Sequence, residues 1–247
     1  MGKRLGTALA GMVVVVGLAG GLAACSDDAA EAESRSAPGP ARNRIPDLKP
    51  AKALQRARKA TRKLSDAQYA GTLAIPAGEH EYVVMDGTWH VARNGNCTMD
   101  GKAAGFGKLS ARIIGEKTYL RANRNFLMRL IGLDETTAKL FHNDWVGGPS
   151  SDATLPFCDG RVFLGGQRLP SRCQAGKHKT IEKAPTLAFT CAGGRHALTV
   201  YVAITGKPVI MRLTGTNDQG PFELTMVAHD TGVPVKPPKP KAVVNGP

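Results

Sequence analysis

Two blocks of short strand-like runs constrain the fold of this chain more than any other feature. Each block holds five runs that are rich in β-branched, aliphatic or aromatic residues and are bounded by Gly, Asn, Asp or Pro. The runs are 69–75, 81–85, 88–92, 108–114 and 117–121 in the first block, and 179–183, 186–191, 196–204, 208–214 and 222–228 in the second. Runs of this length between turn-forming residues are typical of antiparallel strands. The pattern therefore predicts a large antiparallel sheet, with Gly115-Glu116 as a tight hairpin turn.

Apolar residues recur at helical spacing in two other places. Leu54, Ala57, Thr61 and Leu64 follow Pro50, which suits the first turn of a helix. Residues 123–143, between the two strand blocks, predict two short helices with Asp134 near an N-cap. We expect an α+β fold in which a curved antiparallel sheet, a half-barrel, wraps around a few helices within residues 50–235.

The first 25 residues have the order of a bacterial lipoprotein signal. Lys3 and Arg4 precede an apolar run that ends in Ala23-Ala24-Cys25, and a hydrophilic stretch follows at once. We predict that residues 1–24 are a signal peptide and that Cys25 is lipidated, which would hold the chain at the extracytoplasmic face of the cell membrane. An ordinary cleaved signal and an uncleaved N-terminal anchor are the alternatives.

Both flanks of the expected domain have the composition of exposed chain. Residues 25–49 are rich in Ala, Glu, Ser, Pro and Arg, with few large apolar side chains, and predict a disordered tether. Residues 236–247 combine Pro with Lys and predict an extended, exposed tail.

The chain is strongly basic, with 33 Lys and Arg against 20 Asp and Glu, a formal charge of +13. For an exported protein this balance favours anionic lipid head groups or wall polymers as partners, and we expect no nucleic acid. The basic residues of the opening helix would form either a solvated surface or a face that meets an anionic membrane surface or wall polymer. That face consists of Lys52, Arg56, Lys59, Arg62 and Lys63.

Four cysteines remain besides Cys25, an even number in a compartment that permits disulfides. We favour the pairs Cys97–Cys158 and Cys173–Cys191, because the second pair flanks a predicted hairpin. These bonds would secure residues 147–176, a Gly-, Pro- and Ser-rich stretch that we expect to be a loop. The wide spacing of the cysteines and the lack of a C-x-x-C pair argue against a zinc site.

The sequence lacks the common motifs of catalytic sites. The sequence has no G-x-S-x-G, Walker-type, H-E-x-x-H or S-x-x-K signature, and its six histidines are scattered singly. We therefore predict no catalytic residue, no metal, no cofactor and no enzyme activity. An unusually apolar insert remains, which either fills the core or lines a pocket for an acyl chain. The candidate lining residues are Phe126, Leu127, Leu130, Ile131 and Leu133.

Several short motifs together resemble a known family. They are the hairpin Gly115–Leu120, the Cys97-Thr98 and Phe157-Cys158-Asp159 pieces, and the strand-turn-strand Tyr201–Pro208 followed by Ile210–Leu213. Over about residues 50–235 the chain resembles the LolA/LppX-like lipoproteins of the LppX/LprG type, found in actinobacterial cell envelopes. The resemblance implies an unclosed sheet with a hydrophobic cavity that receives lipids in some members, and no catalytic residues. We expect an anchored lipoprotein that binds or carries a lipidic ligand; the alternative is an envelope protein–protein interaction module with a filled core.

Overall fold

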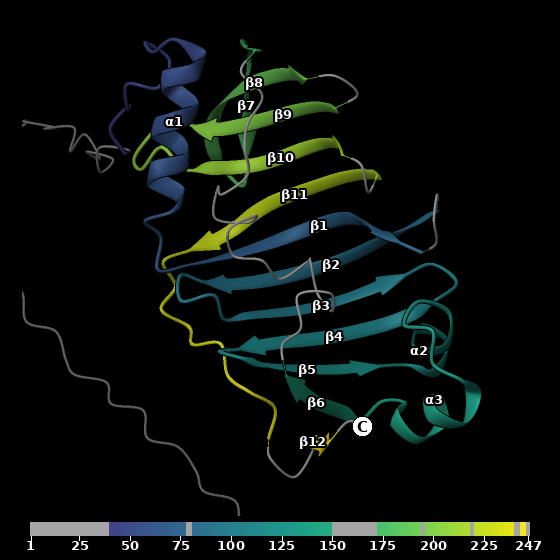
Figure 1. The fold of residues 1–247 in the computed structure, drawn as a ribbon. Helices are drawn as coiled ribbons and strands as arrows, with labels where there is room; N and C mark the ends of the chain where they lie inside the picture. The colour runs from purple at the N-terminus through teal and green to yellow at the C-terminus, as the bar shows by residue number, and fades with distance from the viewer. Residues whose placement is uncertain are drawn as a thin grey trace, which may run out of the picture. The chain divides into compact units, whose positions relative to one another are not determined.

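One twelve-stranded sheet makes up most of the described chain (Figure 1). The computed structural model describes residues 40–77, 81–149, 172–193, 196–217, 220–239 and 243–245. The helices are α1 (Pro50–Thr61), α2 (Arg124–Arg129) and α3 (Glu135–Phe141). The strands are β1 (Asp66–Pro76), β2 (Tyr82–Ala92), β3 (Cys97–Ala103), β4 (Gly107–Ile114), β5 (Lys117–Ala122), β6 (Trp145–Pro149), β7 (Arg172–Ile181), β8 (Ala184–Gly193), β9 (His196–Ala203), β10 (Ile210–Asn217), β11 (Gly220–His229) and β12 (Val243–Asn245).

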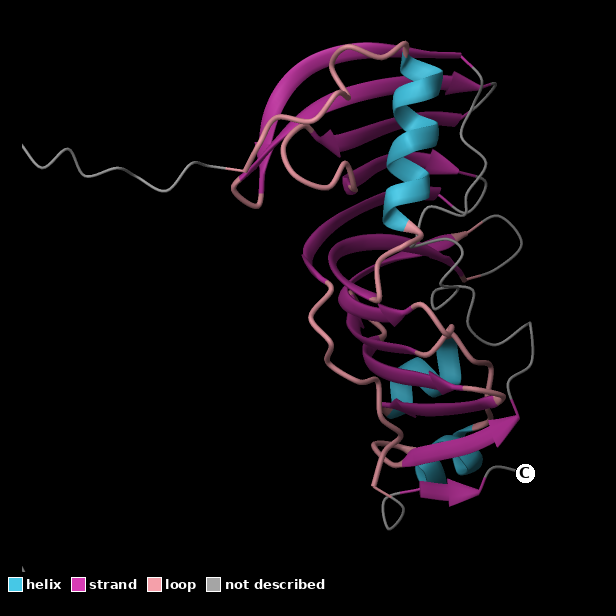
Figure 2. Ribbon diagram, turned by 90° about the vertical axis from the view of Figure 1, so that its left-hand side faces the viewer, coloured by secondary structure: helices cyan, strands magenta, loops and turns pink. Residues whose placement is uncertain are grey.

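The strand order shows how two sequence blocks become one sheet. It runs β12-β6-β5-β4-β3-β2-β1-β11-β10-β9-β8-β7, with only the β12–β6 pair parallel. Strands β1 to β6 and β7 to β11 are each consecutive neighbours, and the two sets join where β1 pairs with β11. We call this β1–β11 junction the seam. The predicted curved, unclosed antiparallel sheet is confirmed, and its helices lie on the concave side (Figure 2).

Most predicted strands exist, but several boundaries were wrong. Runs 81–85 and 88–92 are the single strand β2, because Asp86 and Gly87 keep their pairing with β1 on one side and β3 on the other. Strand β3 was not predicted, since its alternation is carried by only a few apolar residues among polar ones and glycine. Residues 172–176, predicted as loop, begin β7, which extends to Ile181 and turns through Glu182 and Lys183, both with positive φ.

Local sequence explains the helices. Asp134 caps α3 by accepting hydrogen bonds from the backbone N–H groups of Thr136 and Thr137, both at 3.0 Å, so the predicted cap is confirmed. Pro50 starts α1, whose buried residues include Leu54 and Thr61. The Thr61 hydroxyl accepts a hydrogen bond from the N–H of Ile210 at 3.0 Å, which fixes α1 to the start of β10.

Glycines allow the sheet to bend near the seam. Gly71, Gly87 and Gly101 lie opposite one another across β1, β2 and β3. A side chain at any of the three would collide with a neighbouring strand, most severely at Gly71, where a Cβ would overlap the carbonyl oxygen of Glu223. β-Bulges between Gln68 and Tyr69 and near the start of β10 add to the curvature.

Two apolar clusters fill the concave side. The α1 cluster joins Leu54 and Ala57 to inward residues of β8, β9 and β10, among them Phe189 and Val200. The insert cluster joins α2 and α3 to inward residues of β1 to β5 and β11, and it also includes Ile181, Ala203 and Met211 of β7, β9 and β10.

The folded region reaches back before α1. Ile45, within the segment predicted as a tether, is fully buried in the α1 cluster. The backbone N–H of Asn43 donates to the Ile204 carbonyl at 2.8 Å, and its side-chain amide donates to the Ala203 carbonyl at 2.9 Å. An isolated apolar residue between Pro and Arg gave no periodic signal, so only the tertiary contact identifies this segment as folded.

The C-terminal segment follows the sheet instead of leaving it. Residues 231–239 contain no helix or strand, and Arg112 donates a hydrogen bond to the Lys236 carbonyl at 3.1 Å. Strand β12 then pairs with the free edge of β6. Within the predicted tail, Lys236, Pro237 and Lys239 are exposed, whereas Pro238 is buried and β12 belongs to the sheet.

Candidate functional site

The concave face of β1 to β5 presents a continuous apolar surface. Period-two alternation places Tyr69, Trp89 and Met99 in one cross-strand row, and all three are buried. Leu109 and Met85 lie on the same face and are also buried. Burial raises the pKa of the Tyr69 hydroxyl, so this residue stays neutral at physiological pH.

The five insert residues proposed from the sequence do not share one environment. Phe126 and Leu127 are buried inside the insert cluster, and Leu130 and Leu133 pack against it. Ile131 is 41% exposed. Four of the five therefore contact the apolar interior, and their role as ligand-lining residues stays a prediction.

A cavity of about 410 Å³ opens at the end of the sheet where β7–β8, β9–β10 and β11 meet. Its apolar part includes Met211, Met226, Val209 and Ala203, and all four are buried. Its polar part is contributed by Glu182, Lys207 and His229. Methionine side chains adapt to irregular apolar ligands, and the volume lies within the roughly 300–1,000 Å³ of small-molecule sites. We call this the Met211–Met226 cavity.

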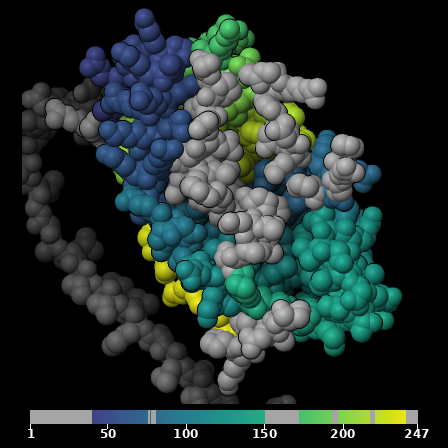
Figure 3. All heavy atoms as spheres, viewed as in Figure 1, coloured from purple at the N-terminus to yellow at the C-terminus, as the bar shows by residue number. Residues whose placement is uncertain are grey.

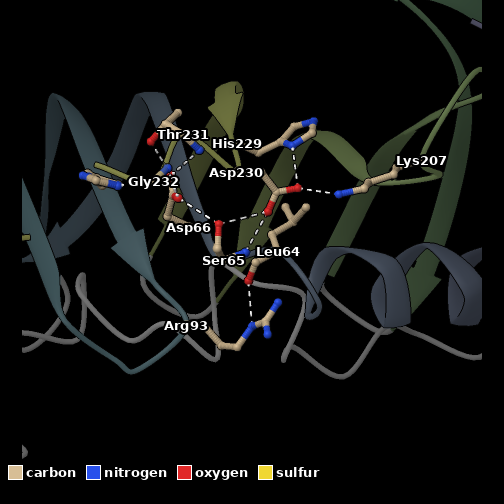
Figure 4. Close-up of polar contacts among 10 residues, drawn as sticks. Leu64, Ser65, Asp66, Arg93, Lys207, His229, Asp230, Thr231 and Gly232 are labelled. Carbon is tan, nitrogen blue, oxygen red and sulfur yellow. Dashed lines mark hydrogen bonds and ion pairs between the residues drawn. The ribbon is translucent and has the colours of Figure 1, made fainter. Parts of the chain in front are cut away.

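A polar network lies directly beside this cavity (Figure 4). Asp230 accepts from the Lys207 ammonium at 2.6 Å and lies 3.5 Å from His229 Nδ1. The other oxygen of Asp230 accepts from the backbone N–H of Ser65 at 2.8 Å and from its hydroxyl at 3.1 Å. The hydrogen bond from Lys207 and those from Ser65 lower the pKa of Asp230 despite some desolvation. The network therefore joins the chain after α1 to the polar side of the cavity.

Asp66 extends this network across the seam. Its carboxylate accepts from the Thr231 hydroxyl at 2.6 Å, from the Thr231 N–H at 3.2 Å and from the Gly232 N–H at 3.0 Å, and it lies 3.4 Å from His90 Nε2. Desolvation raises the pKa of Asp66, but these hydrogen bonds and one from the Ser65 hydroxyl outweigh it and lower the pKa to about 2. The buried carboxylate thus ties the start of β1 to the end of β11.

A second cavity, of about 580 Å³, lies near the β3–β4 turn. Its wall is largely glycine, alanine and backbone, with Asp86, Lys102 and Lys108 around it. Val84 is the largest aliphatic side chain that lines it, whereas the Met211–Met226 cavity has two methionines and two valines.

The sequence did not predict the Met211–Met226 cavity, and none of the five insert residues lines it or the second cavity. One signal was present. The motif Tyr201–Pro208, noted for its resemblance to a family, contains Ala203, Thr205 and Lys207, which all line the cavity. The motif could not identify the residues on the other side of the cavity, since Met226 and His229 come from β11, which β10 separates from the motif in the sequence.

One predicted disulfide is present, and the other involves a residue outside the described part of the chain. Cys173 and Cys191 form a disulfide between β7 and β8, as predicted. Cys97 is also disulfide-bonded, but Cys158, its predicted partner, lies outside the described residues. Within the described residues, no group of three His, Cys, Asp or Glu side chains is placed to hold a metal ion.

The predicted signal peptide, the lipidation site Cys25 and the tether up to residue 39 also lie outside the described residues. In the part of the chain that the structure describes, no helix is long and apolar enough to cross a membrane. The five residues of the predicted basic face, in contrast, are all described and all exposed on or just after α1.

Comparison with known proteins gives matches in structure only. No protein-family model matches the chain, and no curated protein matches its sequence. LprF from Mycobacterium bovis matches at 14% identity and a TM-score of 0.49, covering 75% of this chain and 94% of its own. The lipoprotein LppX from Mycobacterium tuberculosis matches at 16% identity and a TM-score of 0.49, covering 74% of this chain and 96% of its own.

The matched structures include LppX, a lipoprotein of the type that the sequence resembles. A putative outer membrane lipoprotein-sorting domain from Vibrio parahaemolyticus also matches, at 9% identity and a TM-score of 0.27, over 73% of this chain and 92% of its own. At these identities the likeness concerns the fold alone.

Proposed function

We propose that this chain is a membrane-anchored extracytoplasmic lipoprotein that binds a lipidic ligand in its half-barrel. The observation that carries the proposal is the Met211–Met226 cavity, in which buried apolar side chains lie next to a polar side formed by Glu182, Lys207 and His229. This division matches an amphiphile, whose acyl chain needs an apolar surface and whose head group needs polar partners.

The energetics favour such a ligand. Burying an acyl chain contributes about 0.8 kcal/mol per CH₂ group, so a few methylenes offset much of the entropy lost on binding. Lys207 would meet an anionic head group, and Asp230 holds the ammonium in place. The insert residues Phe126 and Leu127 would contribute an apolar surface farther along the concave face.

The sequence supports the anchor. Between Cys25 and the first described residue, Pro40, the chain has 14 residues of polar composition. Fourteen residues reach at most roughly 50 Å when fully extended, so an acylated Cys25 would hold the half-barrel near its bilayer.

The ligand is tested with the mature chain carrying Cys25→Ser, which removes the acyl anchor. Native mass spectrometry and titration with a fluorescent fatty acid and a fluorescent phospholipid should show a bound amphiphile. Ala228→Trp places a large ring in the Met211–Met226 cavity and should weaken binding at least tenfold. Ala192→Trp, at an exposed position of β8, is the matched control and should leave binding unchanged.

A chain that neither copurifies with lipid nor takes up either probe would contradict the proposal. That result would favour the alternative, an interaction module of the cell envelope with a filled core. Equal binding by both tryptophan variants would show that an amphiphile binds at another place in the molecule.

A further inference from the structure

The positive charge of this chain is concentrated in one half of the sheet. In residues 66–149, which hold β1 to β6, Lys and Arg number 9 and Asp and Glu also number 9. In residues 40–65 and 172–229, which hold α1 and β7 to β11, Lys and Arg number 16 and Asp and Glu only 4. The fold brings these two basic segments together, since α1 packs against β7 and β10.

Helix α1 presents the densest part of this charge. Lys52, Arg56 and Lys59 recur at spacings of four and three residues, which aligns them along one side of the helix, and Lys63 follows two residues after its end. The opposite side, with Leu54, is buried in the α1 cluster. We call these four residues the α1 stripe. They are exposed, and α1 forms an open ridge in the space-filling view (Figure 3).

The charge of the α1 stripe is unpaired among the described residues. No ion pair joins any of its four residues to an acid within the described residues, whereas Lys102, Arg124, Lys139, Lys207 and Arg212 elsewhere each have one. Helix α1 itself contains no Asp or Glu. Arg172 and Lys177 of the neighbouring strand β7 are exposed and add to the positive potential.

Hydrogen bonds connect the chain just after the α1 stripe to the Met211–Met226 cavity. Lys63 is two residues before Ser65, which donates two hydrogen bonds to Asp230. Asp230 in turn holds Lys207, which lines the cavity. The end of the basic face and the polar side of the cavity are therefore parts of one connected structure (Figure 4).

We propose that the α1 stripe docks on an anionic bilayer surface and thereby presents the Met211–Met226 cavity to lipid. The cavity's ligand rests on the function proposed above; the docking surface rests on the charge distribution. A bilayer is the occupant that fits, because the 14 residues before Pro40 confine the half-barrel near an acyl group on Cys25. Each Lys or Arg near an anionic membrane contributes about fivefold to binding, within a Debye length of roughly 8 Å.

The test uses the mature chain with Cys25→Ser, so that only the protein surface can bind. Vesicles of phosphatidylcholine alone and with one-third phosphatidylglycerol are sedimented with the chain at low and at physiological salt. The triple variant Lys52→Gln, Arg56→Gln, Lys59→Gln should lower the partition coefficient on anionic vesicles roughly 100-fold. The control triple variant Lys102→Gln, Lys108→Gln, Lys117→Gln removes the same charge from the other half and should change it less than fivefold.

The outcomes separate this inference from the proposed function. Equal losses in the two triple variants, or binding to soluble polyphosphate without binding to anionic vesicles, would overturn the docking surface. The stripe variant should still bind dispersed fluorescent fatty acid as the parent chain does, but take up lipid from vesicles at least tenfold more slowly. Ala228→Trp should bind vesicles normally, so a failure of ligand binding alone would leave the docking result intact.

Discussion

The two halves of the sheet differ in the helices that cover them and in their net charge. The half formed by β7 to β11 is covered by one amphipathic helix of 12 residues, α1, and carries an excess of positive charge. The half formed by β1 to β6 has two helices of 6 and 7 residues, α2 and α3, and balanced charge. In the functions proposed above, the half with α1 would meet an anionic surface, and the Met211–Met226 cavity lies in that same half.

The largest expected effect comes from breaking the seam between the halves. Gly71→Ala would place a Cβ against the Glu223 carbonyl and force β1 and β11 apart, so the free energy of unfolding should fall by more than about 4 kcal/mol. Gly95→Ala, at a position that also has positive φ but has open space around it, should cost only about 1 kcal/mol. Chemical denaturation measures both, and similar losses would mean that the seam tolerates the extra atom.

The two apolar clusters should respond separately. Phe126→Ala in the insert cluster should cost about 3–5 kcal/mol and Leu54→Ala in the α1 cluster about 2–5 kcal/mol, since both side chains are buried. If the halves pack independently, the double variant should lose the sum to within about 0.5 kcal/mol. A large departure from additivity in denaturation experiments would show that the halves act as one core.

The Cys173–Cys191 disulfide should stabilise only the half of the sheet formed by β7 to β11. Replacing both Cys173 and Cys191 by Ser removes a link across 18 residues and should lower the free energy of unfolding by about 2–3 kcal/mol. Hydrogen exchange should report faster opening of β7 and β8 and unchanged protection of β2 to β4. Equal loss of protection in both halves would contradict this separation.

The smallest expected effect on stability comes from Asp66, the buried carboxylate at the seam. The folded pKa of Asp66, about 2, lies below its unfolded value of 3.8, so its stabilisation is complete above about pH 4 and is lost as pH falls toward 2. Asp66→Asn should cost roughly 1–2 kcal/mol at neutral pH and flatten the loss of stability in that pH window. Asp100→Asn, an exposed control on β3, should leave the acid limb of the stability curve unchanged.

Much of the local structure could be predicted from short stretches of sequence. The spacing of Leu54, Ala57 and Thr61 predicts α1 because helix periodicity depends on residues three and four apart. Gly115-Glu116 predicts the β4–β5 hairpin for the same local reason. The prediction missed β3, in which Cys97, Met99 and Ala103 point inward between polar residues and are recognisable only once β2 and β4 flank them.

The candidate site was predicted less well, because its parts come from distant segments. Lys207 lies in the family-like motif Tyr201–Pro208, yet its ion-pair partner Asp230 follows a different strand, β11. The insert residues gave a strong apolar signal, and the structure uses Phe126 mainly to fill the core beneath the sheet.

The sequence by itself determined the strand and helix periods, the basic side of α1 and the cysteine pair of one hairpin, since each depends on neighbours along the chain. Tertiary structure alone decided the seam, in which residues more than 150 positions apart pair as β1 and β11. It also decided the glycine row that bends the sheet, the assembly of two basic segments into one half, and the Met211–Met226 cavity. These features arise where strands pair across long separations, and no local period encodes such contacts.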